Sequence, residues 1–364
     1  KEILGCTGRI TELGLGNSNA KFLPVNSVMI ALNGQGKTRG SVALLRTKAT
    51  CNQSLVSIYP KNINYLLPEY LYINLHSRYE EIRKVTGDSG NDRRGLNMPL
   101  IKGIEIPLPP LPEQQRIVTI LDEAFEGIGA AVANAEKNLA NARELFESYL
   151  NNVFTQKGEG WVEKKLSKAV SSVSTGPFGS ILHKSDYIDD GIPVVNPINI
   201  VDGRVRPSNS KTVSKEKAKS LETYVLDADD IVVGRRGEIG RCAVIKAEQA
   251  GWLCGTGCFH IKLSDNLNPY FLVNLLRAAK YRAKLEKLAT GTTMKNLSNT
   301  SLQNLVIAIP SSMEAQDELV CLLDKLSAET QRLETICQQK LTALAELKQS
   351  ILQKAFAGQL TMEN

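Results

Sequence analysis

Residues 107–116 read Pro-Leu-Pro-Pro-Leu-Pro-Glu-Gln-Gln-Arg, and one helical pattern continues from there to Phe154. Proline is tolerated at a helix start, because its missing N–H would have no partner there. The prolines therefore predict the end of the preceding structure and the start of a helix near Glu113. Apolar side chains then recur at alternating steps of four and three, the pattern of a coiled-coil seam. The seam residues are Leu121, Phe125, Ile128, Val132, Ala135, Leu139, Ala142, Phe146, Tyr149 and Val153.

A second long helix is predicted after Ile309-Pro310-Ser311-Ser312-Met313-Glu314, reaching Phe356. The two stretches align at an offset of about 202 residues, with Leu121-Asp122 matching Leu323-Asp324. Each helix of about 40 residues would be roughly 60 Å long. The second seam is less regular, which predicts a local stutter. Its expected face carries Leu319, Leu322, Leu326, Leu333, Cys337, Leu341, Leu344, Leu347 and Ile351.

The chain is therefore expected to be a duplication, in the order domain, long helix, domain, long helix. The predicted fold class is α+β: two mixed α/β domains with pseudo-twofold symmetry, separated by two long antiparallel coiled-coil helices. The expected boundaries are 1–110 for the first domain, 111–157 for the first helix, 158–311 for the second domain and 312–364 for the second helix and tail. Residues 161–201 have no counterpart before Lys1, so the first domain is expected to be N-terminally incomplete.

Within the domains, apolar and alternating runs predict short strands, and apolar residues at helical spacing predict one helix each. In the first domain, strands are expected at 22–32, 41–45, 55–59 and 101–108, and a helix at 68–82. In the second, strands are expected at 192–200, 223–233, 242–245 and 302–309, and a helix at 269–288.

The composition suits a two-domain protein with a mildly basic surface. The 364 residues carry a formal net charge of +6, which fits a polyanionic partner without requiring one. The seven cysteines are an odd, scattered set, and neither a signal peptide nor a membrane-length apolar run is evident. Free thiols in a reducing cytoplasm, bacterial or archaeal, are expected. Cys254, Cys258 and His260 lie close together but lack the second ligand pair of a zinc motif.

Two glycine-bearing basic turns occupy matching places in the two halves. Residues 33–38 resemble the end of a phosphate-binding loop, but position 31 is Ala where that motif requires Gly. The matching stretch, residues 234–241, is no such loop. Each turn could be a solvated hairpin, but the matching places favour contacts to nucleic-acid phosphates or bases. The three histidines are dispersed and no carboxylate pair stands out, so no catalytic site is predicted.

These features together resemble the specificity subunit of type I restriction–modification systems. The resemblance is carried by the proline-rich start at 107–115 and by 350–360, Ser-Ile-Leu-Gln-Lys-Ala-Phe-Ala-Gly-Gln-Leu. Gly160-Trp161, Gly176–Ser180, Asp186-Tyr187, Gly191–Pro193 and Thr290–Thr293 also look like that family. The second proline-rich start is reduced, to Pro310-Ser311-Ser312-Met313-Glu314.

The resemblance implies a non-catalytic subunit that reads a bipartite, gapped site on double-stranded DNA with two target-recognition domains. It implies two modification subunits carrying the S-adenosylmethionine chemistry of adenine methylation. It also implies restriction subunits that use ATP and magnesium. No cofactor, metal or membrane contact is expected in this chain itself. The alternatives are the recognition region of a self-contained methyltransferase or nuclease, and a coiled-coil adaptor without DNA binding.

The residues expected to contact DNA lie on the two basic turns and on three polar loops. Charged side chains there would hold phosphates, and arginine could read base edges. They are Lys37, Arg39, Arg93, Arg94, Ser180, Lys184, Arg235, Arg236, Arg241, Thr292, Thr293 and Lys295.

Overall fold

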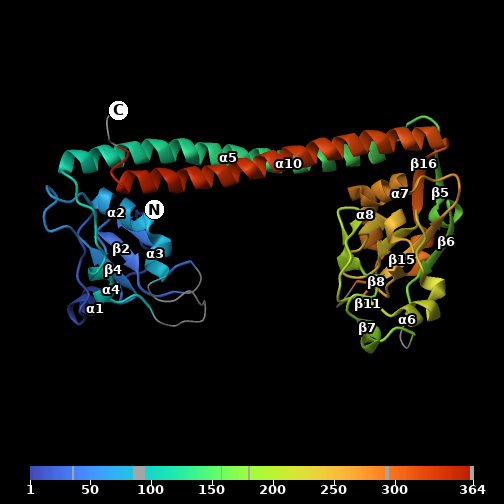
Figure 1. Ribbon diagram of the computed structural model, residues 1–364, viewed down its shortest axis with the longest axis horizontal. Coiled ribbons are helices and arrows are strands. Elements are labelled where there is room, and N and C mark those ends of the chain that lie inside the picture. The colour runs from blue at the N-terminus through green and yellow to red at the C-terminus, as the bar shows by residue number, and fades with distance from the viewer. Residues whose placement is uncertain (35–36, 85–94, 157, 179–180, 292–294, 361–364) are drawn as a thin grey trace. The chain divides into compact units, whose positions relative to one another are not determined.

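The fold combines small sheets with helices, so the α+β class is confirmed (Figure 1). The computed structural model describes residues 1–34, 37–84, 95–156, 158–178, 181–291 and 295–360. The chain divides into two compact units. Unit 1 comprises residues 1–138 and 337–364, and unit 2 comprises residues 139–336. Each long helix therefore contributes one end to each unit.

Unit 1 contains a four-stranded sheet in the order β1-β3-β2-β4. The strands are β1 (Glu2–Ile3), β2 (Val28–Ala31), β3 (Val42–Leu45) and β4 (Leu55–Ile58). The helices are α1 (Glu12–Gly16), α2 (Pro68–Ser77), α3 (Tyr79–Lys84), α4 (Met98–Lys102) and the first part of α5 (Leu111–Thr155). Figure 1 shows α2 between this sheet and the long helices, where Tyr70 and Ile73 contribute to a core with Ile117 and Leu121.

Unit 2 repeats this plan and adds strands ahead of it. Its main sheet has the order β13-β12-β15-β6, and a second sheet has the order β14-β8-β11-β7. The main-sheet strands are β6 (Val170–Thr175), β12 (Ile231–Gly234), β13 (Cys242–Val244) and β15 (Cys258–Leu263). The second sheet comprises β7 (Tyr187–Ile188), β8 (Ile192–Val195), β11 (Thr212–Val213) and β14 (Leu253–Cys254). Two further pairs are β9 (Ile200–Val201) with β10 (Arg204–Val205), and β5 (Trp161–Lys165) with β16 (Val306–Pro310).

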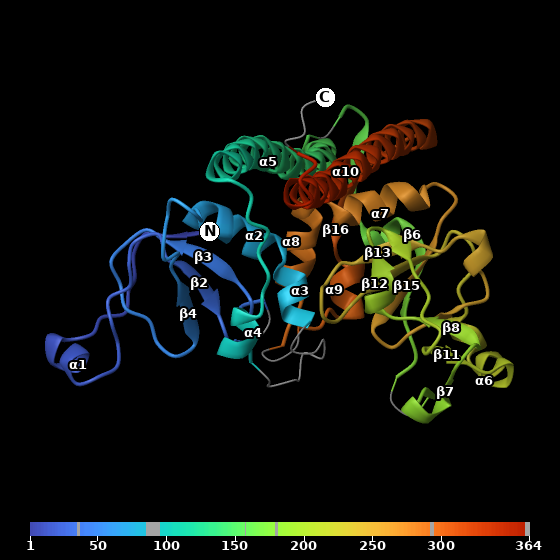
Figure 2. The same ribbon diagram turned by 60° about the vertical axis from the view of Figure 1, so that its left-hand side comes forward.

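The helices of unit 2 follow the same order as those of unit 1. They are α6 (Lys215–Ser220), α7 (Pro269–Arg277), α8 (Ala279–Leu288), α9 (Asn299–Gln303) and the first part of α10 (Met313–Phe356). Figure 2 shows α7 between α10 and the sheet that contains β12, β13 and β15. Short 3-10 turns cover Leu166–Lys168, Lys184–Asp186, Pro197–Asn199, Glu222–Tyr224 and Ala247–Gln249.

The hairpin β2–β3 of unit 1 corresponds to β12–β13 of unit 2. In both, the first strand pairs antiparallel with the second and also with a third strand, β4 or β15. All residues of the two first strands, β2 and β12, are buried, since each strand lies between its sheet neighbours and near a covering helix. The duplication expected from the sequence is therefore present in the fold.

The long helices pack against each other in antiparallel fashion within each unit. In unit 1, Ile117 and Leu121 near the start of α5 share a core with Leu352 and Ala355 near the end of α10. In unit 2, Leu150 and Phe154 near the end of α5 share a core with Val320 and Leu323 near the start of α10. The antiparallel pairing expected from the seams is therefore observed in both units.

The predicted seam residues are correct for much of α5 and partly wrong for α10. Leu121, Ala135 and Ala142 are buried as expected, but Leu150 and Phe154 replace Tyr149 and Val153 as the fully buried pair. The last turns of α5 face the domain core of unit 2 as well as α10, so another face is buried there. On α10, the expected face is exposed at Leu322, Leu333 and Leu347.

The extent of several other elements differs from the sequence prediction. The expected strands 22–32 and 223–233 are strand only in β2 and β12, and the expected strand 302–309 begins inside α9 and is strand only from Val306. The predicted helices 68–82 and 269–288 are each two helices, broken at Arg78 and Ala278. The predicted strand 101–108 is wrong: α4 ends at Lys102, and residues 104–110 form no strand. The matching segment of unit 2 does form strand β16, because β5 lies beside it.

A buried glutamine ties each long helix to the loop that leads into α2 in unit 1 or α7 in unit 2. Gln114 donates to the carbonyls of Tyr65 and Pro109 and accepts from the N–H of Leu67, at 2.8–2.9 Å. Gln316 makes the same three bonds, to Asn266, Pro310 and Asn268, at 2.9–3.2 Å. The start of the second long helix therefore keeps the buried glutamine although it has lost most of the prolines. The first glutamine of the Glu-Gln-Gln motif at 113–115 has a structural role.

Candidate nucleic-acid interface

The basic turn of unit 2 connects β12 to β13, and its first arginine is held inside the protein. Arg235 is 6% exposed, and its guanidinium lies 4.8 Å from the ring centroid of Phe178 and 5.3 Å from that of Phe259. Its Nε donates to Asn296 Oδ1 at 3.1 Å. Burial, and then the nearby charge of Arg236, lower the pKa of Arg235 from its ordinary value. The sequence predicted a turn that meets solvent or DNA, so the burial of Arg235 was not expected from it.

No carboxylate of the described residues pairs with Arg235, and its Nη1 has no hydrogen-bond partner among them. A buried charged group without a full set of partners is costly. The two aromatic faces offset part of this cost, since a cation over a ring is stabilised by the ring quadrupole. Within the described residues, the Nη1 donor of Arg235 is therefore left without an acceptor.

The loop from Thr290 to Asn296 is joined to the basic turn through its backbone. Thr290 and Asn296 exchange N–H···O bonds of 3.0 and 2.8 Å, and Leu297 N donates to Arg235 O at 2.9 Å. Arg236 pairs with Asn296 as an isolated bridge, and both Arg236 and Lys295 are exposed. The structure thus brings together Arg235, Arg236 and Lys295, while Thr292 and Thr293 lie outside the described residues.

Arg241 closes the same turn but is already paired. Its guanidinium bonds Glu238 Oε2 at 2.5–2.6 Å and reaches the carbonyl of Pro197 at 3.5 Å. Lys184 is exposed at the start of the 3-10 turn before β7, so it belongs to the region of the second sheet. Ser180 lies outside the described residues.

A hollow of about 610 Å³ in unit 2 adds two arginines that the sequence reasoning missed. Arg277, at the end of α7, and Arg282, on α8, line it together with Arg241 and Lys295. Glu147, Glu238 and Glu286 also line it, so its walls carry both signs of charge. The signal available in the sequence was the basic character of residues 277–287, in the second half of the helix predicted at 269–288.

The basic turn of unit 1 is attached to α3. The carbonyl of Lys37 accepts from Tyr79 Oη at 2.7 Å, and the carbonyl of Arg39 accepts from Arg83 Nη1 at 3.3 Å. Lys37 is exposed and Arg39 is half-buried. Arg93 and Arg94 lie outside the described residues.

A glycine in each basic turn packs against a short helix, α3 in unit 1 and α8 in unit 2. Gly40 has φ of +79°, and a Cβ there would lie 3.2 Å from Arg83 Cγ of α3. Gly240 has φ of +85°, and a Cβ there would lie 3.2 Å from Leu285 Cδ1 of α8. Positive φ with so close a neighbour favours glycine at both places. The two turns therefore share a positive-φ glycine that packs on the equivalent helix, although their side chains differ.

Cys254, Cys258 and His260, which lie close together in the sequence, are all buried in the core of unit 2. His260 Nε2 lies 2.6 Å from Asp230 Oδ2, and both side chains are buried. Burial raises the pKa of the Cys254 thiol to about 12 and that of Cys258 well above its ordinary value. Among the residues that the structure describes, no group of three or more such side chains is placed to hold a metal ion.

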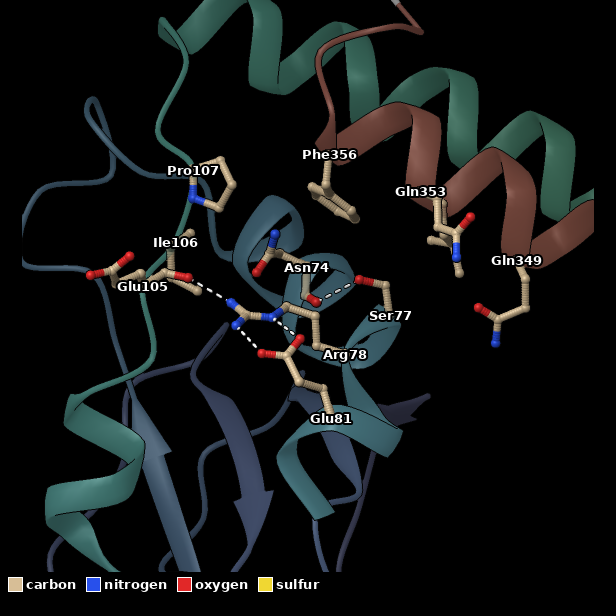
Figure 3. Close-up of a pocket in the computed structure, with 11 residues that line it drawn as sticks. Asn74, Ser77, Arg78, Glu81, Glu105, Ile106, Pro107, Gln349, Gln353 and Phe356 are labelled. Atoms are coloured by element: carbon tan, nitrogen blue, oxygen red, sulfur yellow. Dashed lines mark hydrogen bonds and ion pairs between the residues drawn. The ribbon is translucent and has the colours of Figure 1, made fainter. Parts of the chain in front are cut away.

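Unit 1 has a hollow of about 660 Å³ between α2, residues 105–107 and the end of α10 (Figure 3). Arg78 lies at its edge, pairs with Glu81 at 2.5–2.8 Å and donates to the carbonyl of Glu105. The ion pair with Glu81 raises the pKa of Arg78 and lowers that of Glu81. On this side of the segment, the carbonyls of Glu105 and Pro107 accept hydrogen bonds from Arg78 and Tyr70.

In the described part of the chain, no helix is long and apolar enough to cross a membrane. Four leucines and an isoleucine of the long helices are exposed to solvent. These residues, each 40–50% exposed, are Leu145, Leu322, Leu333, Ile336 and Leu347.

Comparisons with known proteins agree with one another. The chain is 25% identical to the EcoBI specificity subunit of Escherichia coli over 280 residues, which are 71% of this chain but only 59% of that protein. It is 23% identical to the MjaVIII specificity subunit of Methanocaldococcus jannaschii, over 94% of this chain and 82% of that one.

Solved structures show the same fold at low sequence identity. The HsdS subunit of Thermoanaerobacter tengcongensis matches with a TM-score of 0.59 and 21% identity, covering 93% of this chain and 82% of that chain. A chain from a study of assembly and conformational transition in a type I restriction–modification system matches with a TM-score of 0.77 and 22% identity, covering 94% and 85%.

The family model for the type I restriction modification DNA specificity domain matches residues 4–134 and 159–343, which are most of the sequence. The two matched ranges correspond to the two copies of the duplicated fold. The chain therefore belongs to the family of type I restriction–modification specificity subunits.

Proposed function

We propose that the chain is the DNA-reading subunit of a type I restriction–modification complex and recognises a bipartite, gapped site, one half with each domain. The observation that carries this proposal is the matched pair of basic turns. Each lies between equivalent strands and packs through a positive-φ glycine on the equivalent helix. Two equivalent surfaces on one chain suit a target with two half-sites.

In this proposal the exposed cations hold phosphates and the buried arginine acts closer to the bases. Lys37, Arg236 and Lys295 are exposed and can meet the DNA backbone without rearrangement. Arg235, fixed between two rings, would keep its fork geometry, which suits bidentate recognition of a base edge. The remaining candidates are Arg39, Arg93, Arg94, Ser180, Lys184, Arg241, Thr292 and Thr293.

The long helices are proposed as the docking surface for two modification subunits and, through the complex, for restriction subunits. Exposed leucines on helices that already have a partner helix suit burial against another protein. S-adenosylmethionine, ATP and magnesium would then belong to those partners, and this chain would contribute recognition without catalysis. A bacterial or archaeal cytoplasm is the proposed compartment.

The test uses the complex assembled from this chain and its modification subunits. Wild-type complex is expected to methylate a split DNA motif, mapped by methylome sequencing. Arg236→Ala with Lys295→Ala should weaken binding at all sequences and reduce the slope of log affinity against log salt by about 2, one for each phosphate contact.

The matched control is Lys168→Ala with Lys219→Ala, which removes two exposed charges of unit 2 outside the basic turn. This variant should keep the wild-type salt slope. A continuous methylated motif, or equal slopes for the two double variants, would refute the proposal. Binding of S-adenosylmethionine by this chain alone would favour the alternative of a self-contained methyltransferase.

A further inference from the structure

One isoleucine of unit 2 is largely exposed on a short turn between β8 and β9. Ile198 is 76% exposed, although the residues that follow it, Asn199 and Ile200, are buried. A single apolar side chain on a protein surface is common and by itself indicates nothing. The case for a role of Ile198 therefore depends on how the turn is held and on what surrounds it.

The turn that carries Ile198, residues 197–199, is held in place by three hydrogen bonds. Asn199 Oδ1 accepts from the N–H of Asn196 at 2.9 Å, and Asn199 Nδ2 donates to the carbonyl of Arg206 at 3.0 Å. The carbonyl of Asn199 accepts in turn from the N–H of Arg206 at 2.7 Å. A proline at the start of the turn restricts the backbone further. The protein therefore presents Ile198 to its surroundings on a well-defined turn.

This turn lies against the start of the basic turn of unit 2. A Cβ at Gly257 would lie 2.7 Å from Pro197 Cδ, and a Cβ at Gly234 would lie 3.4 Å from Pro197 Cβ. The carbonyl of Gly257 accepts from the N–H of Arg235 at 2.9 Å. Ile198, the residue after Pro197, therefore belongs to the same group of loops as Arg235.

The surroundings of Ile198 favour duplex DNA as its contact. Arg236 is exposed, and Phe178, whose ring packs on the guanidinium of Arg235, is 43% exposed. A duplex offers phosphates to the cations, and the 5-methyl groups of thymine are the apolar groups of its major groove. The preferred base contact of arginine, to guanine O6 and N7, lies in that same groove. Side chains on adjoining loops would therefore meet one groove together.

We propose that Ile198 contacts the 5-methyl group of one thymine in the half-site read by unit 2, and so helps to select that base. This inference rests on the proposed function, because it requires unit 2 to bind DNA. The contact adds base selection to the phosphate contacts of Arg236, which carry no sequence information. Burial of one methyl-sized group corresponds to about a fourfold change in affinity. Ile198 is thus a specificity residue with a modest effect at a single base.

The test uses the complex of this chain with its modification subunits, and duplexes that carry the motif mapped by methylome sequencing. Deoxyuridine, which lacks only the 5-methyl group, replaces each thymine of the motif in turn, on both strands. Dissociation constants are measured by fluorescence anisotropy without S-adenosylmethionine. At one thymine, the wild-type complex should bind the deoxyuridine duplex about fourfold more weakly. Ile198→Ala should bind the two duplexes equally, as a double-mutant cycle requires for a direct contact.

Two further variants separate this contact from general effects. Ile198→Val keeps part of the side chain and should keep part of the discrimination at the same thymine. Val162→Ala shortens another exposed apolar side chain of unit 2, on β5, and should keep the full wild-type discrimination. The unfolding temperatures of all three variants should stay close to that of the wild type, because each changed side chain is exposed.

The proposal is overturned if Ile198→Ala keeps the wild-type preference for thymine at every position. It is also overturned if Ile198→Ala weakens binding to all duplexes equally, as loss of a side chain inserted between base pairs would do. A wild-type complex without a preference for thymine over deoxyuridine at any position has the same consequence. Failure of the proposed function would be seen separately, as a continuous methylated motif or as equal salt slopes.

Discussion

The buried glutamine at the start of each long helix offers a test of how the fold is held together. Gln114 is fully buried, and its three bonds join the loop before α2, the proline-rich segment and α5. Gln114→Met keeps the volume but removes every bond. Two carbonyls and one N–H of unit 1 then lose their partner.

The magnitude follows from those three bonds. A neutral hydrogen bond contributes about 1 kcal/mol net, and a buried group left without a partner costs about 1–3 kcal/mol. Gln114→Met should therefore lower the free energy of unfolding of unit 1 by about 3 kcal/mol or somewhat more. A shift of roughly 2–4 °C per kcal/mol predicts a fall of about 6–12 °C in its unfolding temperature.

Gln115→Met is the matched control, because Gln115 is the adjacent, exposed residue of the same Glu-Gln-Gln motif. It should change the unfolding temperature by less than about 2 °C. Hydrogen exchange resolves the two units: amides of α2 in unit 1 should exchange faster in Gln114→Met, and those of α7 in unit 2 should not. Equal stability of the two variants would refute the structural role assigned to the glutamine.

Three other predictions follow from packing and burial. Phe154→Ala should cost about 3–5 kcal/mol of stability in urea unfolding, whereas Phe356→Ala should cost clearly less, because only Phe154 is fully covered. Gly240→Ala should destabilise more than Gly237→Ala: both have positive φ, but only Gly240 has a neighbour, Leu285, within 4 Å. At pH 8, a thiol reagent should modify the exposed Cys6 and Cys321 within minutes and leave Cys242 and Cys254 unmodified. Burial raises the pKa of the Cys242 and Cys254 thiols to about 12, so neither forms the reactive thiolate at this pH. Rapid reaction at either buried thiol would contradict this prediction.

The parts of the fold that sequence predicted well are those decided by local pattern. The long helices are confirmed because dozens of residues repeat one apolar spacing behind a proline-rich start. The strand predicted at 101–108 is wrong because strand formation depends on a neighbour as well as on β-branched residues. In the matching segment of unit 2, Val306–Pro310 form β16, where β5 supplies that neighbour.

Less of the candidate interface could be predicted. Sequence identified both basic turns from their glycines and charges, and the structure brings Arg235, Arg236 and Lys295 together. It gave no sign that Arg235 is buried, because the covering rings of Phe178 and Phe259 come from distant strands and loops. It also missed Arg277 and Arg282, which reach the same hollow only through the packing of α7 and α8.

The arrangement of the duplicated cores explains why the two long helices end in similar segments, each running from a serine to a phenylalanine. Phe154 follows the first domain in the chain but packs on Phe271 in unit 2, and Phe356 follows the second domain but packs on Tyr70 in unit 1. Each domain is therefore completed by the end of the helix that the other domain begins. A residue change in the Ser-to-Phe segment that ends one repeat must accordingly be judged against the core of the other repeat.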